Sequence, residues 1–345
     1  MCNIIICIHK SGAKGVRCGV DEKKEKIIAV AGPTASGKTS LAVSLAMRFS
    51  GEIISCDSMQ LYRGMDIGTA KVTPEEAQGI TYHLTDVFDI TESFSVSDYV
   101  SLAEDAVRDI VSRGKLPIFC GGTGLYLDSF LSGLDFGEYD NIPGLREELS
   151  AVAAKEGGKE KFHEMLRSID SVAAEEIHPA NVKRVIRAIE IYRSSGITPT
   201  EQKRRSLLKG SKYSALVIIL GFADRQKLYD RIDRRVDKML EEGLLDEAKN
   251  LIEAGLMETP TASAAIGYKE FLPFFEGTAT LEECTEVLKR ESRRYAKRQM
   301  TWFSRRKDAL TLNVDEYDKD GLISAAAEAA EKFLGGADTF GGECK

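Results

Sequence analysis

Residues 32–39 constrain this 345-residue chain more than any other segment. They read Gly-Pro-Thr-Ala-Ser-Gly-Lys-Thr and match the P-loop pattern G-x-x-x-x-G-K-[ST]. An apolar run at 27–30 predicts a strand before the loop, and residues 38–49 predict a helix after it. A loop in this context surrounds phosphate oxygens with backbone N–H groups and adds the positive potential of a helix N-terminus. The predicted phosphate-binding residues are Gly32, Pro33, Thr34, Ala35, Ser36, Gly37, Lys38 and Thr39, with Lys38 at the terminal phosphate and Thr39 as a Mg²⁺ ligand.

Strand and helix patterns alternate beyond this loop. Strands are expected at 52–56, 116–120, 215–220 and 309–313, and the main helices at 96–112, 224–241, 244–254, 262–274, 280–304 and 317–334. Such alternation indicates an α/β fold, a P-loop NTPase-like parallel sheet flanked by helices. Residues 138–210 show helical patterns only, which predicts an inserted helical domain between the core segments 26–137 and 211–335. Residues 1–25 are expected to be a disordered extension, and 336–345 a mobile tail.

Cysteine spacing, hydropathy and charge limit the possible functions. The seven cysteines are scattered without a C-x-x-C pair, which argues against a disulfide framework and a zinc site. No apolar run approaches the roughly 18–20 residues of a membrane span, so we expect a cytoplasmic protein. The formal net charge is −7, yet residues 289–307 hold nine Lys or Arg and one Glu. This basic segment on an acidic body predicts a specific anionic partner.

The position of the acidic residue near the P-loop distinguishes this chain from ordinary P-loop ATPases. Those enzymes hold Mg²⁺ with an acid at the end of another strand, whereas the strand 116–120 here runs into Gly-Gly-Thr. An acid follows the second strand instead, as Asp57. Ligands of open α/β sheets bind at the carboxyl ends of the strands, so Asp57 and Thr123 should face the P-loop's ligand. Asp57 is then placed to act as a general base, or, alternatively, is a turn or N-cap residue.

Longer motifs resemble the tRNA dimethylallyltransferase (tRNA isopentenyltransferase) family, in its bacterial form. Besides the P-loop, the most specific is 57–71, Asp-Ser-Met-Gln-Leu-Tyr-Arg-Gly-Met-Asp-Ile-Gly-Thr-Ala-Lys. The others, in order, are Gly-Gly-Thr-Gly-Leu-Tyr at 121–126, Arg-Val-Ile-Arg-Ala-Ile-Glu at 184–190, the pairs 224–225, 228–229 and 231–232, Ile-Gly-Tyr-Lys-Glu at 266–270, and Lys-Arg-Gln-Met-Thr-Trp-Phe at 297–303. The resemblance extends from about residue 27 to 314.

The resemblance implies a reaction. Members of the family transfer a dimethylallyl group from dimethylallyl diphosphate to N6 of the adenine at tRNA position 37, beside the anticodon. Asp57 would take the N6 proton and Thr123 would position the base. Lys38, Arg231 and Mg²⁺ would stabilise the departing diphosphate. A bidentate contact is the expected role of Arg231, and a solvated arginine on a helix face is the alternative.

A base in an anticodon loop must be flipped out to reach such a site. The resemblance and the basic segments together predict a set of tRNA contacts. In the helix over 181–193, apolar residues recur at helical spacing and leave the basic ones on the other side. In 280–304, residues 281, 288, 295 and 302 recur at sevens, and the basic residues between them should be exposed. The predicted contacts are Asp57, Ser58, Met59, Gln60, Thr123, Arg146, Lys183, Arg184, Arg187, Ile266, Gly267, Tyr268, Lys269, Lys297, Arg298, Gln299, Thr301 and Trp302.

Some features depart from the family or leave alternatives open. Thr81-Tyr82-His83-Leu84 stands where the family commonly has Pro-His-His-Leu, and the zinc finger of some eukaryotic members is absent. Trp302 could be a core residue or a stacking surface. The alternative functions are a prenyltransferase acting on free adenine nucleotides, a P-loop kinase of small molecules, and a non-catalytic RNA-binding module with a vestigial P-loop. The protein is expected to be a monomer.

Overall fold

The computed structural model describes residues 24–133, 142, 144–155 and 157–335. The expected tail at 336–345 and all but the last two residues of the expected N-terminal extension lie outside the described residues. Six strands form one parallel sheet in the order β3-β2-β4-β1-β5-β6. The strands are β1 (Glu25–Ala31), β2 (Gly51–Ser55), β3 (Tyr82–His83), β4 (Leu116–Gly121), β5 (Tyr213–Gly221) and β6 (Leu310–Asn313). The predicted α/β class is confirmed, and β3 was not predicted because a two-residue strand has no periodic pattern.

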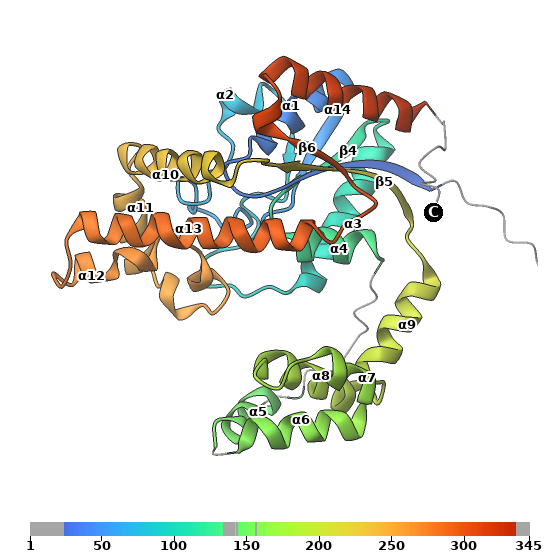
Figure 1. Ribbon diagram of the computed structural model, residues 1–345, viewed down its shortest axis with the longest axis vertical. Coiled ribbons are helices and arrows are strands. Elements are labelled where there is room, and N and C mark those ends of the chain that lie inside the picture. Colours follow the sequence, from blue (N-terminus) through green and yellow to red (C-terminus); the bar gives the residue numbers. More distant parts are fainter. Residues whose placement is uncertain (1–23, 134–141, 143, 156, 336–345) are drawn as a thin grey trace, which may run out of the picture.

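Helices cover both faces of this sheet, as Figure 1 shows. Alternate side chains of β1 enter different cores. Ile28 and Val30 pack with α1 (Lys38–Arg48) and α14 (Lys319–Leu334). Ile27 and Ala29 pack with α3 (Val96–Ser112) and α4 (Gly124–Leu131) on the other face. A strand buried on both faces reads as a continuous apolar run, which is why β1 was recognisable in the sequence.

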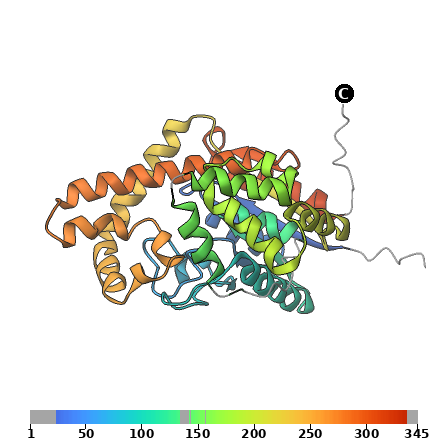
Figure 2. The same ribbon diagram turned by 90° about the horizontal axis from the view of Figure 1, so that it is seen from below.

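Residues 142–210, where described, form a body of helices beside the sheet domain. It contains α5 (Leu145–Ala153), α6 (Gly158–Ile169), α7 (Ser171–Glu176), α8 (Val182–Ser195) and α9 (Pro199–Lys209), and α9 leads back to β5. The apolar faces of α5 to α8 share a hydrophobic cluster of their own. Figure 1 shows this helical body below the sheet domain, and Figure 2 shows it in front when the molecule is viewed from that side.

Between β5 and β6 the chain builds a second wall of helices. Here α10 (Arg225–Glu241) packs against α13 (Leu281–Phe303), and α11 (Leu244–Glu253) connects them with short turns. The predicted helix over 262–274 is wrong. The chain instead makes the 3₁₀ turns η2 (Ala262–Ala264) and η3 (Lys269–Phe271) and the single turn α12 (Leu272–Phe275). Gly267 interrupts the helix because its φ of +112° is incompatible with one.

The remaining elements are short, and the described residues contain no membrane-spanning helix and no group of side chains that could hold a metal ion. The other short elements are α2 (Pro74–Ala77), η1 (Leu256–Glu258) and η4 (Val314–Glu316). The buried thiols of Cys56 and Cys120 belong to different cores, on opposite faces of the sheet. Among the described residues, no helix is long and apolar enough to cross a membrane. No group of three or more His, Cys, Asp or Glu side chains in the described ranges could hold a metal ion.

A buried carboxylate ties β2 to its surroundings. Glu52 is 1% exposed and accepts hydrogen bonds from His83 at 2.6 Å, Lys115 at 2.6 Å and the Arg113 guanidinium at 2.7 Å. The bond from Arg113, assisted by the other two, holds the pKa of Glu52 far below its usual value. His83 thus contributes to this cluster around the buried carboxylate, through its hydrogen bond to Glu52.

Glu52→Gln is therefore expected to destabilise the fold by about 3 kcal/mol, at the lower end of the range for a broken buried ion pair, because Arg113 and Lys115 can be rehydrated. A carboxyl with a depressed folded pKa stabilises above its unfolded pKa, and this contribution is lost as the pH falls below about 4.5. Urea unfolding at pH 7 and pH 3.5 measures both effects. The gap between wild type and variant should narrow at pH 3.5, and an equal gap at both values would contradict the assignment.

Candidate active site

The P-loop joins the end of β1 to the start of α1. Gly32 passes so close to β5 that a Cβ would lie 2.5 Å from the Leu220 carbonyl oxygen. Gly37, with φ of +88°, is the N-cap of α1. Because glycine has no side chain, the first backbone amides of the helix have no side-chain acceptor at the N-cap. Lys38 Nζ donates to the Pro33 carbonyl at 2.6 Å. The segment thus has the strand–loop–helix arrangement that the motif predicted.

Three cations gather at this loop without an acidic partner. Of the ion pairs in the described part of the chain, none includes Lys38, Arg231 or Arg235. Burial lowers the pKa of Lys38 to about 8, with a smaller lowering from the charge of Arg235, and burial also lowers the pKa of both arginines. Unpaired cations removed from water are costly, so the arrangement favours binding of an anion.

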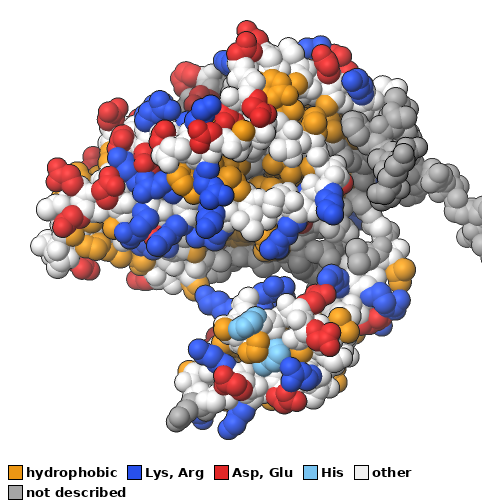
Figure 3. Space-filling view, viewed as in Figure 1, with side chains coloured by type: hydrophobic (Ala, Val, Ile, Leu, Met, Phe, Trp, Pro, Cys, Tyr) orange, Lys and Arg blue, Asp and Glu red, His pale blue; other side chains and the backbone are white. Residues whose placement is uncertain are grey.

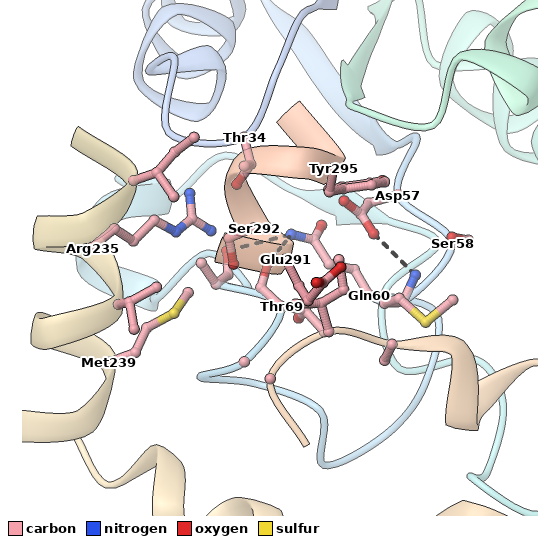
Figure 4. A pocket seen from close by; sticks show the side chains of 18 of the residues that line it. Thr34, Asp57, Ser58, Gln60, Thr69, Arg235, Met239, Glu291, Ser292 and Tyr295 are labelled. Atoms are coloured by element: carbon pink, nitrogen blue, oxygen red, sulfur yellow. Dashed lines mark hydrogen bonds between the residues drawn. The ribbon is translucent and has the colours of Figure 1, made fainter. Parts of the chain in front are cut away.

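The two arginines come from one face of α10. Arg231 lies over the Phe222 ring, and its Nη2 is 3.7 Å from the position of a Cβ on Gly37. Arg235, one turn later, lines the cavity beside the P-loop (Figure 4). Arg231 was predicted from the sequence, whereas Arg235 was not. The i, i+4 spacing of the two is a signal that could have revealed the second.

Asp57 follows β2 at the carboxyl edge of the sheet. Its Oδ1 accepts the Met59 amide at 3.0 Å, so the residue does shape a turn. Thr123 supports the same turn, because its hydroxyl oxygen accepts the Ser58 amide at 3.1 Å. The loops touch so closely that a Cβ on Gly121 would lie 2.1 Å from the Cys56 carbonyl oxygen. Asp57 is held in place by these contacts, and Figure 4 shows its carboxylate beside the Tyr295 ring.

Several of these groups line a cavity of about 430 Å³, a size typical of small-ligand sites. Arg231 and Thr123 are not among the residues that line it. Its polar end is formed by the P-loop, Asp57 and Arg235. A second part is apolar. A third wall comes from three loop segments, of which 58–60 and 266–269 contain predicted tRNA contacts and 68–70 does not. The apolar lining includes Ile232, Val236, Met239, Leu244 and Leu288, and the loop wall includes Ser58, Met59, Gln60, Gly68, Thr69, Ala70, Ile266, Gly267 and Lys269.

Gln299 connects the P-loop to the loop after β4. Its Oε1 accepts the Thr34 amide at 2.8 Å, and its Nε2 donates to the Gly122 carbonyl at 3.0 Å. The side chain is 5% exposed. Both polar groups of Gln299 are already occupied, so the structure gives it a role in holding the site together, and tRNA contact by this residue stays a prediction.

Other predicted tRNA contacts differ in how they are placed. Trp302 is 36% exposed, and its Nε1 donates to Asp128 at 2.6 Å, while its ring packs on Gly124. It therefore has both a packed and a free part. Tyr268 is 1% exposed. Among the predicted tRNA contacts, Ser58 and Met59 are partly exposed. The exposed ones include Lys183, Arg184, Arg187, Lys297, Arg298 and Thr301.

Arg146 is engaged within the helical body. It makes a bidentate pair with Glu190, at 2.7 and 2.8 Å, and Arg187 lies 3.5 Å from the same carboxylate.

The expectation that the basic residues of α13 are all exposed is wrong for two of them. Lys289 pairs with Asp237 and Arg293 with Asp233, because α10 presents its acids to this side of α13. Lys297 and Arg298 form no ion pair among the described residues.

Comparison with known proteins identifies the family. The family described as IPP transferase matches residues 60–307, which is more than half of the chain. The chain belongs to the IPP transferase family. Among relatives, the tRNA dimethylallyltransferase of Halalkalibacterium halodurans is 48% identical over 300 residues, covering 87% of this chain and 95% of that one. The enzyme of the same name from Lachnoclostridium phytofermentans is 44% identical over 299 residues, with coverage of 87% and 95%.

Solved structures of this family share the fold. A tRNA isopentenylpyrophosphate transferase from Bacillus halodurans is 44% identical, with a TM-score of 0.66, and covers 90% of this chain and 99% of its own. A eukaryotic dimethylallyltransferase acting on tRNA is 30% identical, with a TM-score of 0.79 and coverage of 90% and 80%. The family membership and the cavity place the P-loop and Asp57 in one candidate active site.

Proposed function

We propose that this protein transfers a dimethylallyl group from dimethylallyl diphosphate to N6 of the adenine at position 37 of tRNA, releasing diphosphate. The observation that supports it best is the cavity in which two cations without an ion pair, Lys38 and Arg235, stand beside the fixed carboxylate of Asp57, with Arg231 next to the P-loop at Gly37. The cations suit a diphosphate, and the carboxylate suits an exocyclic amine. The names of the relatives support the same pair of substrates.

The chemistry follows from these positions. The N6 atom attacks the allylic carbon of the donor, and the bond from that carbon to the diphosphate oxygen breaks. Negative charge grows on the diphosphate, which Lys38, Arg231 and Arg235 stabilise. Asp57 accepts the proton that N6 loses, while Thr123 fixes the turn that carries Asp57. Asp57 is a weak base, but the amine becomes acidic as its bond to carbon forms.

Magnesium is proposed as the cofactor. The residues present fit it, because the Thr39 hydroxyl lines the cavity without a hydrogen bond to any described residue, and the buried Ser36 hydroxyl of the P-loop has no partner. Thr39 would hold the ion, which would add positive charge at the leaving diphosphate. We propose a monomeric enzyme, and the proposed substrate implies a cytoplasmic location.

The decisive assay uses radiolabelled dimethylallyl diphosphate, Mg²⁺ and either an anticodon stem-loop or AMP. Label in the stem-loop is expected. Label in AMP alone would reassign the protein to adenine-nucleotide prenylation, and label in neither would reject prenyl transfer. A small-molecule kinase or a non-catalytic RNA-binding module would also give no label, and phosphoryl transfer from ATP would then separate these two.

Binding of inorganic diphosphate should weaken as the pH rises through about 8. Burial lowers the pKa of Lys38 to about 8, so the ammonium is charged below this pH and increasingly neutral above it. Calorimetric titration between pH 7 and pH 9 measures the affinity. Lys38→Arg keeps its charge over this range, and the loss of affinity should be smaller in this variant. An identical decline in both proteins would assign the effect to a group other than Lys38.

The exposed basic residues near the end of α13 supply a second prediction. Figure 3 shows Lys and Arg side chains gathered along α13 and on the side of the helical body that faces the sheet domain. Replacing Lys297 and Arg298 by Ala should weaken stem-loop binding and reduce its salt slope by about 1.4, at roughly 0.7 per phosphate contact. The control is the double Ala variant of Lys319 and Lys332, which are exposed on α14 across the sheet. An unchanged slope would show that this end of α13 does not meet RNA.

A further inference from the structure

One carboxylate outside the cavity holds the backbone of the loop 66–71. Glu247, on α11, accepts three consecutive amides: Asp66 at 3.1 Å and Ile67 at 2.7 Å on Oε2, and Gly68 at 2.9 Å on Oε1. Within the loop, the Ala70 amide donates to the Ile67 carbonyl and the Lys71 amide to the Asp66 carbonyl, each at 2.9 Å, which leaves the amides at 66–68 to Glu247. The first of these amides is exposed and the other two are partly buried, so Glu247 stabilises the conformation of the loop by accepting all three.

The same carboxylate reaches a second loop. The Tyr268 hydroxyl donates to Glu247 Oε1 at 2.9 Å, and Tyr268 itself is 1% exposed. Its ring presses on Gly68, where a Cβ would lie 2.6 Å from the Tyr268 hydroxyl oxygen. A Cβ on Gly267 would lie 3.6 Å from the Gly68 Cα. Gly68 and Gly267 both line the cavity, so Glu247 and Tyr268 join two loops into one wall from behind.

This wall is connected to the segment that carries Asp57. The side-chain nitrogen Nε2 of Gln60 donates to the backbone carbonyls of Thr69 and Ala70, each at 3.3 Å. Its oxygen accepts the Ser55 hydroxyl at 2.8 Å, and Ser55 is the last residue of β2, two before Asp57. Figure 4 shows Gln60 and Thr69 next to each other on the same side of the cavity. A shift of the loop 66–71 would therefore be transmitted to the surroundings of Asp57.

We propose that Glu247 is a positioning residue for the acceptor side of the active site. It fixes the loop 66–71 against the Tyr268 loop, so that the wall facing the acceptor base keeps its distance from Asp57. This inference rests on the proposed function, because that function assigns the wall to the acceptor. A carboxylate suits this role because its two oxygens can accept all four hydrogen bonds. A glutamine cannot, since its amide nitrogen would face another donor.

The test compares Glu247→Gln with Glu253→Gln. Glu253 is exposed on the same helix, and its replacement removes the same charge. In Glu247→Gln, hydrogen exchange of the amides at 66–68 should accelerate at least about 10-fold, since opening of the loop becomes easier, while exchange in the P-loop stays unchanged. Glu253→Gln should match the wild type. Unchanged exchange at 66–68, or acceleration throughout the chain, would overturn the proposal.

Kinetics provide the second readout. Glu247→Gln should reduce kcat/KM for the stem-loop about 10- to 100-fold, as expected when a reacting group is misplaced, whereas the Kd of inorganic diphosphate should change less than about 2-fold. A purely structural defect would lower both together. Equal losses in stem-loop transfer and diphosphate affinity would therefore refute the positioning role.

Tyr268→Phe covers the case in which Glu247→Gln fails to fold. It removes one of the four hydrogen bonds and leaves the three amides paired, so a smaller change in the same two readouts is expected. Wild-type exchange at 66–68 and wild-type kinetics in this variant would count against the joined wall. Hydrogen exchange needs no substrate, so its result is independent of the proposed function, whose own failure would appear as absence of label in the wild-type transfer assay.

Discussion

Asp57→Asn is expected to slow dimethylallyl transfer to the stem-loop by about 10³-fold, within the range for loss of a general base. The asparagine oxygen can still accept the Met59 amide, so the turn after β2 should be kept while the proton acceptor is lost. Asp57→Ala removes both and should abolish transfer. Single-turnover transfer rates with saturating donor and stem-loop measure the effect.

Binding of RNA should survive these changes. The stem-loop Kd of Asp57→Asn is expected to stay within about 3-fold of the wild type, because one contact among many phosphate contacts is altered. Filter binding or fluorescence anisotropy at fixed salt measures it. A large loss of RNA affinity with an unchanged rate on the bound complex would mean that Asp57 recognises the base and does not accept its proton.

Arg235→Met is expected to lower kcat/KM for the donor by about 10- to 100-fold, since a charge-assisted hydrogen bond contributes about 1.5–3 kcal/mol. Arg235 has no acidic partner among the described residues, so its guanidinium is free for an anion. Methionine retains the apolar contacts of the arginine stem within α10. Steady-state kinetics with varied donor at saturating stem-loop measure this loss.

A second effect of the same substitution distinguishes Arg235 from a distant surface charge. The charge of Arg235 helps to lower the pKa of Lys38, so in Arg235→Met the pKa of Lys38 should rise and the decline of diphosphate binding should move above pH 8. Arg234→Met is the control, because Arg234 immediately precedes Arg235 on α10 and is exposed. If the pH at which diphosphate binding declines did not change in Arg235→Met, or changed equally in Arg234→Met, the placement of Arg235 beside Lys38 would be contradicted.

Sequence patterns predicted those parts of the site that depend on neighbouring residues. The phosphate loop is a continuous run of eight residues whose glycines and lysine act through the local backbone. The position of Asp57 follows from the rule that parallel strands end at the same edge, once β2 is recognised by its apolar run. The same patterns identified the main strands and the long helices, because buried strands and amphipathic helices repeat at fixed spacing.

Tertiary structure alone decided the rest. Nothing local marks Arg235 as a partner of the P-loop, since its role depends on the packing of α10 against the cavity. Tyr268 looked like an RNA contact, and the fold buries it behind Gly68. Glu247 reads as an ordinary helix-face acid, yet it holds amides about 180 positions away in the chain. Hydrogen bonds across such separations form only when the folded core brings their partners together, so they cannot be predicted from the local spacing of residues. The phosphate loop was thus evident in the sequence, while the walls that shape the cavity around it were determined by tertiary packing.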